Sequence, residues 1–212
     1  MNNPSPQSSR LHEGERRRYS NHPVTFSAVL LAGGESRRMG TDKATFLFRG
    51  KPLWQIQLET LRALRPAEIF VSARTDPTWR PNDMPFIADI PPSRGPLSGL
   101  AASLDQMRTT HLLALAIDMP WMSNKYLEFL CAQIVSGCGV IAKINDRFEP
   151  LAAIYPVHAD ADFRKTLSGT DFSLQTLTRR LIEGGKLREL AVSKEEKELF
   201  RNINELSDLA PP

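Results

Sequence analysis

The feature that most constrains the fold is a short apolar run that stops at paired glycines. Residues 26–32 read Phe-Ser-Ala-Val-Leu-Leu-Ala and are followed by Gly33 and Gly34. A short, almost continuously apolar run is typical of a parallel strand that is buried on both faces. The glycines predict a tight turn directly after this strand. We therefore expect a buried strand that ends in a close backbone turn.

Further apolar segments alternate with amphipathic ones along the chain. We predict additional strands at 68–72, 86–89, 111–117, 139–144, 151–155 and 186–192. We predict helices at 52–64, 97–107, 123–135, 157–167 and 173–183. Strands that alternate with helices favour a parallel α/β sheet. The fold class expected is α/β, a Rossmann-like, doubly wound, mostly parallel sheet with helices on both faces in a single domain.

The first residues differ in composition from the rest of the chain. Residues 1–24 are rich in Ser, Pro, Asn and Arg and lack periodicity, which predicts a disordered basic tail before a domain at 25–212. The net charge is +3, and four arginines against two glutamates in the first 25 residues account for +2 of it. A domain with so little excess positive charge is poorly suited to nucleic acid, although Arg16–Arg18 leave an RNA contact by the tail open.

Composition also limits the cellular setting. The sequence has no apolar run of 18 residues, so we expect no membrane span. It has two cysteines, Cys131 and Cys138, with no second pair to complete a zinc site. Two thiols of this kind predict reduced cysteines in a cytoplasmic protein.

Polar residues follow several predicted strands. Ligands of an open α/β sheet bind beyond the carboxyl ends of its strands. Gly33 with Gly34, Ser72, Asp89 and Asp118 end four of these strands. We therefore expect a glycine turn and two carboxylates to converge at one edge of the sheet.

The segment from Leu31 to Lys43 is the most informative stretch for function. It reads Leu-Ala-Gly-Gly-Glu-Ser-Arg-Arg-Met-Gly-Thr-Asp-Lys. Glycines let backbone N–H groups approach an anion, and Arg37, Arg38 and Lys43 add positive charge, which together suit a polyphosphate. The segment is neither a Walker A motif nor a dinucleotide fingerprint. On composition alone, a surface turn with solvated cations is the alternative.

This segment resembles the signature Leu-Ala-Gly-Gly-x-Ser-x-Arg-Met-Gly-x-Asp-Lys of the molybdenum cofactor guanylyltransferases, members of the nucleotidyltransferase superfamily. The resemblance covers residues 26 to about 209 and implies that this loop wraps the phosphates of GTP. It assigns nucleotide contacts to Leu31, Ala32, Gly33 and Gly34. It assigns phosphate contacts with catalytic roles to Lys43 and Arg38.

The resemblance extends to the two strand-end carboxylates. Asp118, in Asp-Met-Pro, matches a family Asp-x-Pro whose aspartate binds Mg²⁺, which makes it a nucleotide-binding, catalytic and metal residue. A turn cap before Pro120 is the alternative. Asp89 matches an aspartate that contacts the guanine nucleotide, and a carboxylate can accept both the N1–H and the amino group of guanine. A plain loop aspartate is the alternative there.

Weaker matches complete the candidate site. Gly99, in Gly-Pro-Leu-Ser-Gly, matches a family turn beside the base, where it would let the backbone approach the nucleotide. Ser72 stands where relatives often have a GTP-contacting asparagine, which puts this nucleotide contact in doubt. Asn202 and Asn204 resemble a family Asn-x-Asn and are expected at the second substrate, with a helix N-cap role for Asn204 as the alternative. Glu149 before Pro150 either lines the cleft of that substrate or belongs to a plain loop.

The resemblance implies transfer of GMP from GTP to the phosphate of molybdenum-molybdopterin, with release of pyrophosphate. Its implied substrates and cofactor are GTP, the molybdopterin cofactor and Mg²⁺, with cofactor-insertion or molybdoenzyme maturation proteins as candidate partners. Two alternatives stay open from the residues themselves. One is a nucleotidyltransferase that acts on a sugar or polyol phosphate, and the other is a non-catalytic nucleotide-binding module.

Overall fold

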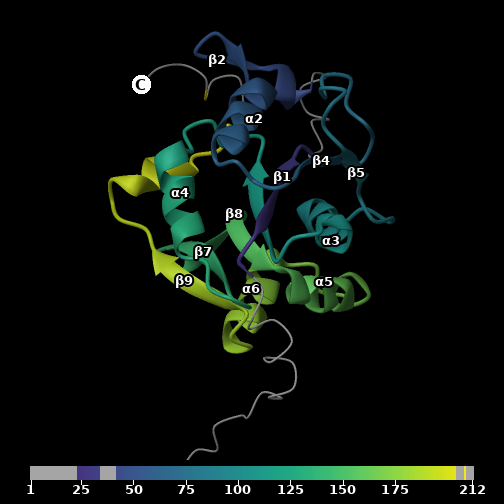
Figure 1. Ribbon diagram of the computed structural model, residues 1–212, viewed down its shortest axis with the longest axis vertical. Coiled ribbons are helices and arrows are strands. Elements are labelled where there is room, and N and C mark those ends of the chain that lie inside the picture. The colour runs from purple at the N-terminus through teal and green to yellow at the C-terminus, as the bar shows by residue number, and fades with distance from the viewer. Residues whose placement is uncertain (1–22, 34–41, 204–207, 209–212) are drawn as a thin grey trace, which may run out of the picture.

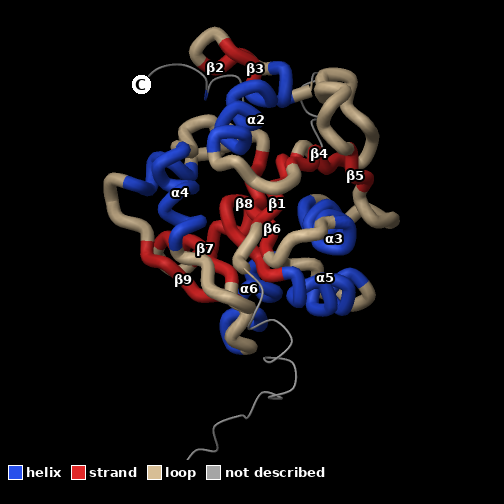
Figure 2. Tube along the Cα trace, in the orientation of Figure 1, coloured by secondary structure: helices blue, strands red, loops and turns tan. Residues whose placement is uncertain are grey.

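A sheet of seven strands runs through the centre of the part of the chain that the computed structural model describes, residues 23–33, 42–203 and 208 (Figures 1 and 2). The strand order is β5-β4-β1-β6-β8-β7-β9. In chain order the strands are β1 (Phe26–Leu31), β4 (Ile69–Ala73), β5 (Phe86–Ala88), β6 (His111–Ala116), β7 (Gly139–Ile144), β8 (Arg147–Pro156) and β9 (Leu187–Ala191). A separate hairpin pairs β2 (Leu47–Phe48) with β3 (Lys51–Pro52).

Most neighbouring strands are parallel, as the alternating pattern predicts. Strands β5, β4, β1 and β6 pair in parallel, and β7 pairs in parallel with β9. Strand β8 is the exception, because it runs antiparallel to both β6 and β7. The short turn between β7 and β8 forces this direction, since a parallel pair needs a longer crossover.

The helices form two layers, one on each face of the sheet (Figure 1). They are α2 (Leu53–Ala63), α3 (Pro96–Gln106), α4 (Asn124–Ala132), α5 (Asp160–Leu167) and α6 (Leu174–Glu183), with short 3-10 turns η2 (Lys43–Thr45), η3 (Val157–Ala159) and η4 (Glu196–Phe200). Helices α2 and α4 pack on one face, and α3, α5 and α6 pack on the other. The expected doubly wound architecture is therefore confirmed.

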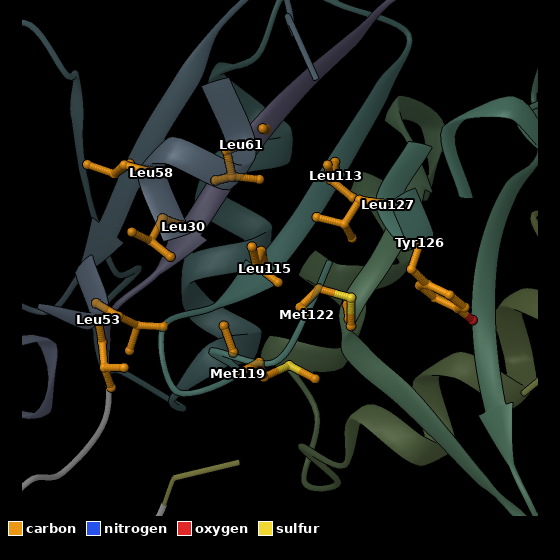
Figure 3. Close-up of a cluster of buried hydrophobic side chains, with 14 of the residues drawn as sticks. Leu30, Leu53, Leu58, Leu61, Leu113, Leu115, Met119, Met122, Tyr126 and Leu127 are labelled. Carbon is orange, nitrogen blue, oxygen red and sulfur yellow. The ribbon is translucent and has the colours of Figure 1, made fainter. Parts of the chain in front are cut away.

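The central strands contribute side chains to the cores on both faces of the sheet. Along β1, Ala28 and Leu30 belong to the core under α2 and α4, whereas Val29 and Leu31 belong to the core under α3. Figure 3 shows the first of these cores, where side chains of α2, β1, β6 and α4 meet. A strand with cores on both faces must be apolar at every position, which explains the continuous apolar run in the sequence.

Three predicted elements differ from the structure by more than one residue at an end. The first turn of the predicted helix at 157–167 is the 3-10 turn η3, and the α-helix begins at Asp160. The predicted helix at 123–135 ends at Ala132, because Val135 and Cys138 form an isolated bridge that turns the chain toward β7. The predicted strand at 151–155 begins earlier, at Arg147, where it pairs with Ile144. Ser123 and Ser173 cap α4 and α6 through their side chains.

Of the predicted tail at 1–24, residues 1–22 lie outside the described residues. Within the described ranges, none of the helices has the length and apolar character needed to cross a membrane.

Candidate active site

The carboxyl ends of the parallel strands bring the predicted polar residues to one edge of the sheet. Leu31, the last residue of β1, pairs with Ser72 on one side and with Ala116 on the other. Asp118 follows β6 by two residues, and Asp89 directly follows β5, with its N–H bonded to Ala73 O of β4 at 3.1 Å. The polar residues that follow the predicted strands therefore lie at one edge of the sheet, as expected.

Lys43 and Asp118 face each other at this edge. Lys43 Nζ lies 3.7 Å from Asp118 Oδ2, and their side chains are 21% and 24% exposed. Such partial burial keeps both groups reachable by a ligand while it limits screening of their charges by water. A pair of this kind can offer one cation and one carboxylate to a phosphate-bearing ligand.

A tryptophan from a distant loop fixes the turn that carries Lys43. Asp42 caps η2, because its Oδ1 accepts the N–H of Ala44 at 3.0 Å. Its other oxygen, Oδ2, accepts the indole N–H of Trp79 at 2.7 Å. Trp79 in turn stacks on Trp54 of α2, with ring centroids 5.9 Å apart. The position of Lys43 therefore depends on side chains from α2 and from the loop between β4 and β5.

A cleft of about 270 Å³ lies around the Lys43–Asp118 pair. Its lining residues are Leu31, Ala32, Gly33, Asp42, Lys43, Pro96, Ala116, Ile117, Asp118 and Leu151. The set includes five of the residues that the sequence predicted for nucleotide binding. Pro96 and Leu151 were not predicted as cleft residues, since an apolar side chain carries no local signal that it borders a ligand.

Asp89 is held in one orientation beside the cleft. Its side chain is almost fully buried, and Oδ2 accepts the hydroxyl of Ser93 at 2.6 Å. The same hydroxyl oxygen accepts the N–H of Gly95 at 3.3 Å, which ties Asp89 to the turn that opens α3. The Oδ1 atom remains directed toward Gly33 and Gly99. This role of Ser93 was not predicted, because a serine in a loop has no distinguishing pattern.

The two glycines near Asp89 differ in what surrounds them. A Cβ built on Gly99 would lie 2.7 Å from Ser72 Oγ and 3.2 Å from Asp89 Oδ1, so only glycine lets α3 approach β4 this closely. A Cβ on Gly33 would lie 3.6 Å from Ala73 Cα and 3.8 Å from Asp89 Oδ2, which is ordinary contact. A methyl group at 99 would therefore displace the side chain of Ser72, whereas one at 33 fits without a shift.

Ser72 lies directly beneath this corner of the site. It is 1% exposed, and its Oγ makes no hydrogen bond to any of the described residues. The close approach of Gly99 leaves little room above the hydroxyl. A serine fits this space, whereas the longer side chain of asparagine would need the helix to move.

The electrostatic setting of Asp118 suits a metal ligand. Burial raises the pKa of its carboxyl, and the neighbouring Lys43 ammonium works in the opposite direction. Among the described residues, no three His, Cys, Asp or Glu side chains gather into a metal site. Mg²⁺ commonly uses one or two carboxylates together with substrate phosphates and water, so a single Asp118 oxygen is a donor set that fits it.

The segment that follows η4 returns to the loop of Asp118. The N–H of Ile203 donates to Asp118 O at 2.8 Å, and Ile203 is fully buried. Asn202, next to it, is exposed. The predicted site residues Gly34, Arg38 and Asn204 lie outside the described residues.

Gly33 after the first strand, Lys43 and Asp118 at the cleft, and Asp89 beside it lie on this α/β sheet in the arrangement that the sequence predicts for a nucleotidyltransferase. The profile of the MobA-like NTP transferase domain matches residues 28–186. The chain belongs to the MobA-like NTP transferase family.

Individual relatives support this assignment. A protein of Opitutus terrae with the name "Probable molybdenum cofactor guanylyltransferase" is 32% identical over 186 residues, which cover 86% of this chain and 92% of that protein. A molybdenum cofactor guanylyltransferase of Xanthomonas euvesicatoria is 30% identical, over 84% of this chain and 89% of its own.

Solved structures agree with the fold. The crystal structure of molybdopterin-guanine dinucleotide biosynthesis protein A from Archaeoglobus fulgidus has a TM-score of 0.67 at 25% identity, over 87% of this chain and 95% of its own. A 4-diphosphocytidyl-2C-methyl-D-erythritol synthase from Anaerococcus prevotii has the same TM-score at 13% identity, over 88% and 93% of the two chains, and shows likeness of fold alone.

Proposed function

We propose that this nucleotidyltransferase transfers GMP from GTP to the terminal phosphate of molybdenum-molybdopterin. An oxygen of the acceptor phosphate attacks the α-phosphorus of GTP, and the bond from that phosphorus to the bridging oxygen of pyrophosphate breaks. The products are pyrophosphate and a guanine dinucleotide of the cofactor. The observation that carries the proposal is the Lys43–Asp118 pair, 3.7 Å apart, in a strand-end cleft of a MobA-like NTP transferase.

Each residue has a distinct part in this proposal. Lys43 neutralises charge on the phosphates as the leaving group departs, a role in which a preorganised cation is effective. Asp89 accepts the N1–H and amino group of guanine, and its bond from Ser93 keeps it oriented for this contact. No covalent enzyme intermediate is needed, because positioning and charge neutralisation drive phosphoryl-type transfer.

Asp118 would hold Mg²⁺ in this proposal. When bound, the metal supplies positive charge that neutralises the phosphates. Leu31, Ala32, Gly33 and Gly34 with Arg38 would surround the nucleotide, and Ser72 and Gly99 would close the site below it. Asn202 and Asn204 would contact the acceptor, since Asn202 adjoins a residue bonded to the loop of Asp118.

Nucleotide binding and turnover test the proposal. Calorimetry with Mg²⁺ should show a preference for GTP over CTP, ATP and UTP, and Lys43→Ala should weaken GTP binding about tenfold because it removes the cation at the phosphates. Asp118→Asn should lower the turnover of GTP with molybdopterin roughly 10²-fold, as for loss of one preorganised stabiliser. A preference for CTP, or turnover only with a sugar or polyol phosphate, would contradict the proposed substrates.

The alternative of a silent binding module makes the opposite prediction for turnover. Such a module would bind GTP but release no pyrophosphate with any phosphate acceptor. Glu59→Gln on the exposed side of α2 serves as a matched control, because it also exchanges a carboxylate for an amide. This variant weakens only exposed contacts, the ion pair with Lys51 and the hydrogen bond from Gln55, and should keep both GTP binding and turnover within about twofold of the wild type.

A further inference from the structure

Strand β8 has an irregular segment at the edge of the cleft. Ile141 of β7 pairs with Ala153, but Lys143 pairs with Phe148, so a step of two residues in β7 spans five residues in β8. The register therefore shifts at residues 149–151. Such bulges re-aim side chains and are common beside active sites.

Two side chains hold the main chain of this segment in place. The amide of Gln175 on α6 accepts the N–H of Phe148 at 3.1 Å and donates to Phe148 O at 2.8 Å. The hydroxyl of Tyr155, which is almost fully buried, donates to Pro150 O at 2.7 Å. Glu149 lies between these two anchored residues. Its backbone position is therefore fixed by contacts on both sides.

The sheet order places this segment on the far side of Asp118 from Asp89. Asp89 follows β5, at one edge of the sheet, while β8 is the strand next to β6 on the other side. Leu151 lines the cleft together with Lys43 and Asp118. With guanine at Asp89 and the phosphates at Lys43, the acceptor would lie over the bulge.

Glu149 has hydrogen-bonding capacity that the described residues leave unused. It is half-buried, and its carboxylate makes no hydrogen bond or ion pair with the described residues. Burial raises the pKa of this carboxyl, and the nearby Arg147 partly offsets the rise. Partial burial of a carboxylate without hydrogen-bond donors costs free energy because the group loses water. A ligand that supplies N–H groups to Glu149 would offset this cost and so bind more tightly.

We infer that Glu149 recognises the pyrimidine edge of the pterin in the acceptor, an inference that rests on the proposed function. A pterin carries an N3–H and a 2-amino group side by side, and a carboxylate accepts both at once. Guanine presents the same pair of donors. Asp89 and Glu149 thus act as two carboxylates of the same chemistry on opposite sides of Asp118 along the sheet, one for the donor nucleotide and one for the acceptor.

The test compares two ligands that differ at one group. The probes are a fluorescent pterin with a phosphate monoester and the matching lumazine, which has a carbonyl oxygen in place of the 2-amino group. The full-length protein is saturated with GTP analogue and Mg²⁺, and dissociation constants are measured by fluorescence anisotropy. We expect the wild type to prefer the pterin about tenfold or more, because a site built for a donor rejects an acceptor there.

The variant Glu149→Gln should bind the pterin about tenfold more weakly and lose the preference over lumazine, because an amide can also donate to the carbonyl. The control Glu128→Gln changes an exposed residue of α4 and should keep both the pterin affinity and the preference over lumazine. Unchanged GTP affinity in Glu149→Gln shows that the fold and nucleotide site are intact. The inference is overturned if wild-type protein binds the two probes equally, a measurement that needs no variant, or if Glu149→Gln keeps the preference.

A separate assay distinguishes failure of this inference from failure of the proposed function. In GMP transfer to molybdopterin, Glu149→Gln should raise the KM for the acceptor about tenfold and leave the KM for GTP within about twofold of the wild type. Wild-type turnover with an unchanged acceptor KM in the variant would overturn the role of Glu149 alone. Absence of wild-type transfer to molybdopterin would overturn the proposed function, and with it the pterin as occupant.

Discussion

Among individual residues, Gly33 tests how the site selects its base. A Cβ at this position meets only ordinary contacts, the nearest being Ala73 Cα at 3.6 Å, so Gly33→Ala should fold with near-normal stability. Its methyl group would project toward Asp89 and narrow the space for a purine. We therefore expect the ratio of GTP to CTP affinity, measured by calorimetry, to fall about tenfold. An unchanged ratio would remove Gly33 from base selection.

His111 provides a pH-dependent prediction for a single side chain. Its ring is fully buried at the start of β6, and burial lowers its pKa from 6.5 to about 4. The unfolded chain therefore binds a proton at higher pH than the folded protein. Protonation of His111 therefore favours the unfolded chain. It leaves the free energy of unfolding unaffected above pH 6.5 and lowers it as the pH falls from 6.5 toward 4, by about 3 kcal/mol in all.

Denaturant unfolding at several pH values checks this. The free energy of unfolding of the wild type should fall more steeply between pH 6.5 and 4 than that of His111→Gln, which has no ring to protonate. Parallel curves for the two proteins would show that His111 is not the titrating group. Both proteins keep Thr110, whose hydroxyl lies 2.9 Å from the ring Nδ1 of His111 in the wild type, so the comparison changes residue 111 alone.

Among the secondary-structure elements, η2 depends on a contact from outside itself. Trp79→Phe removes the indole N–H that donates to Asp42 but keeps an aromatic ring against Trp54. We expect GTP affinity to fall about fivefold, since loss of one hydrogen bond costs roughly 1 kcal/mol and loosens the turn of Lys43. Trp54→Phe, which alters the stack but leaves the hydrogen bond, is the control and should change GTP affinity less. Equal effects would assign the result to stacking.

The elements themselves follow largely from local patterns. The predicted strands at β1, β4 and β7 agree with the structure to within a residue at each end, because continuous apolar runs between turn signals identify buried strands. The hairpin of β2 and β3 was not predicted, since two-residue strands carry no periodicity. The start of β8 was also missed, because Glu149 and Pro150 interrupt its pattern.

For the protein as a whole, stability depends on the layers on both faces of the sheet. Leu113 in β6 is fully buried in the core shown in Figure 3, and Leu113→Ala should lower the free energy of unfolding by about 2–5 kcal/mol. Leu47→Ala makes the same change at a side chain that is 60% exposed and should cost less than about 0.5 kcal/mol. Similar losses in urea unfolding of the two variants would contradict this account of the core.

The class of fold and the main residues of the candidate site follow from the order of residues along the chain. Asp89 and Asp118 could be found because the carboxyl ends of parallel strands meet at one edge, so a local pattern of strand followed by polar residue is enough to bring them together. Lys43 could be found because it adds positive charge to the glycine segment and matches the family signature. The resemblance of the glycine segment supplied the family, which the comparisons confirm.

The strand order and the register shift at Glu149 were set by packing in three dimensions. The same is true of the bond from Trp79 to Asp42, between residues far apart in the sequence, and of the close approach of Gly99 to Ser72. The physical reason is the same in each case. These features depend on contacts between distant segments, and side-chain packing of that kind leaves no periodic signal in the local sequence.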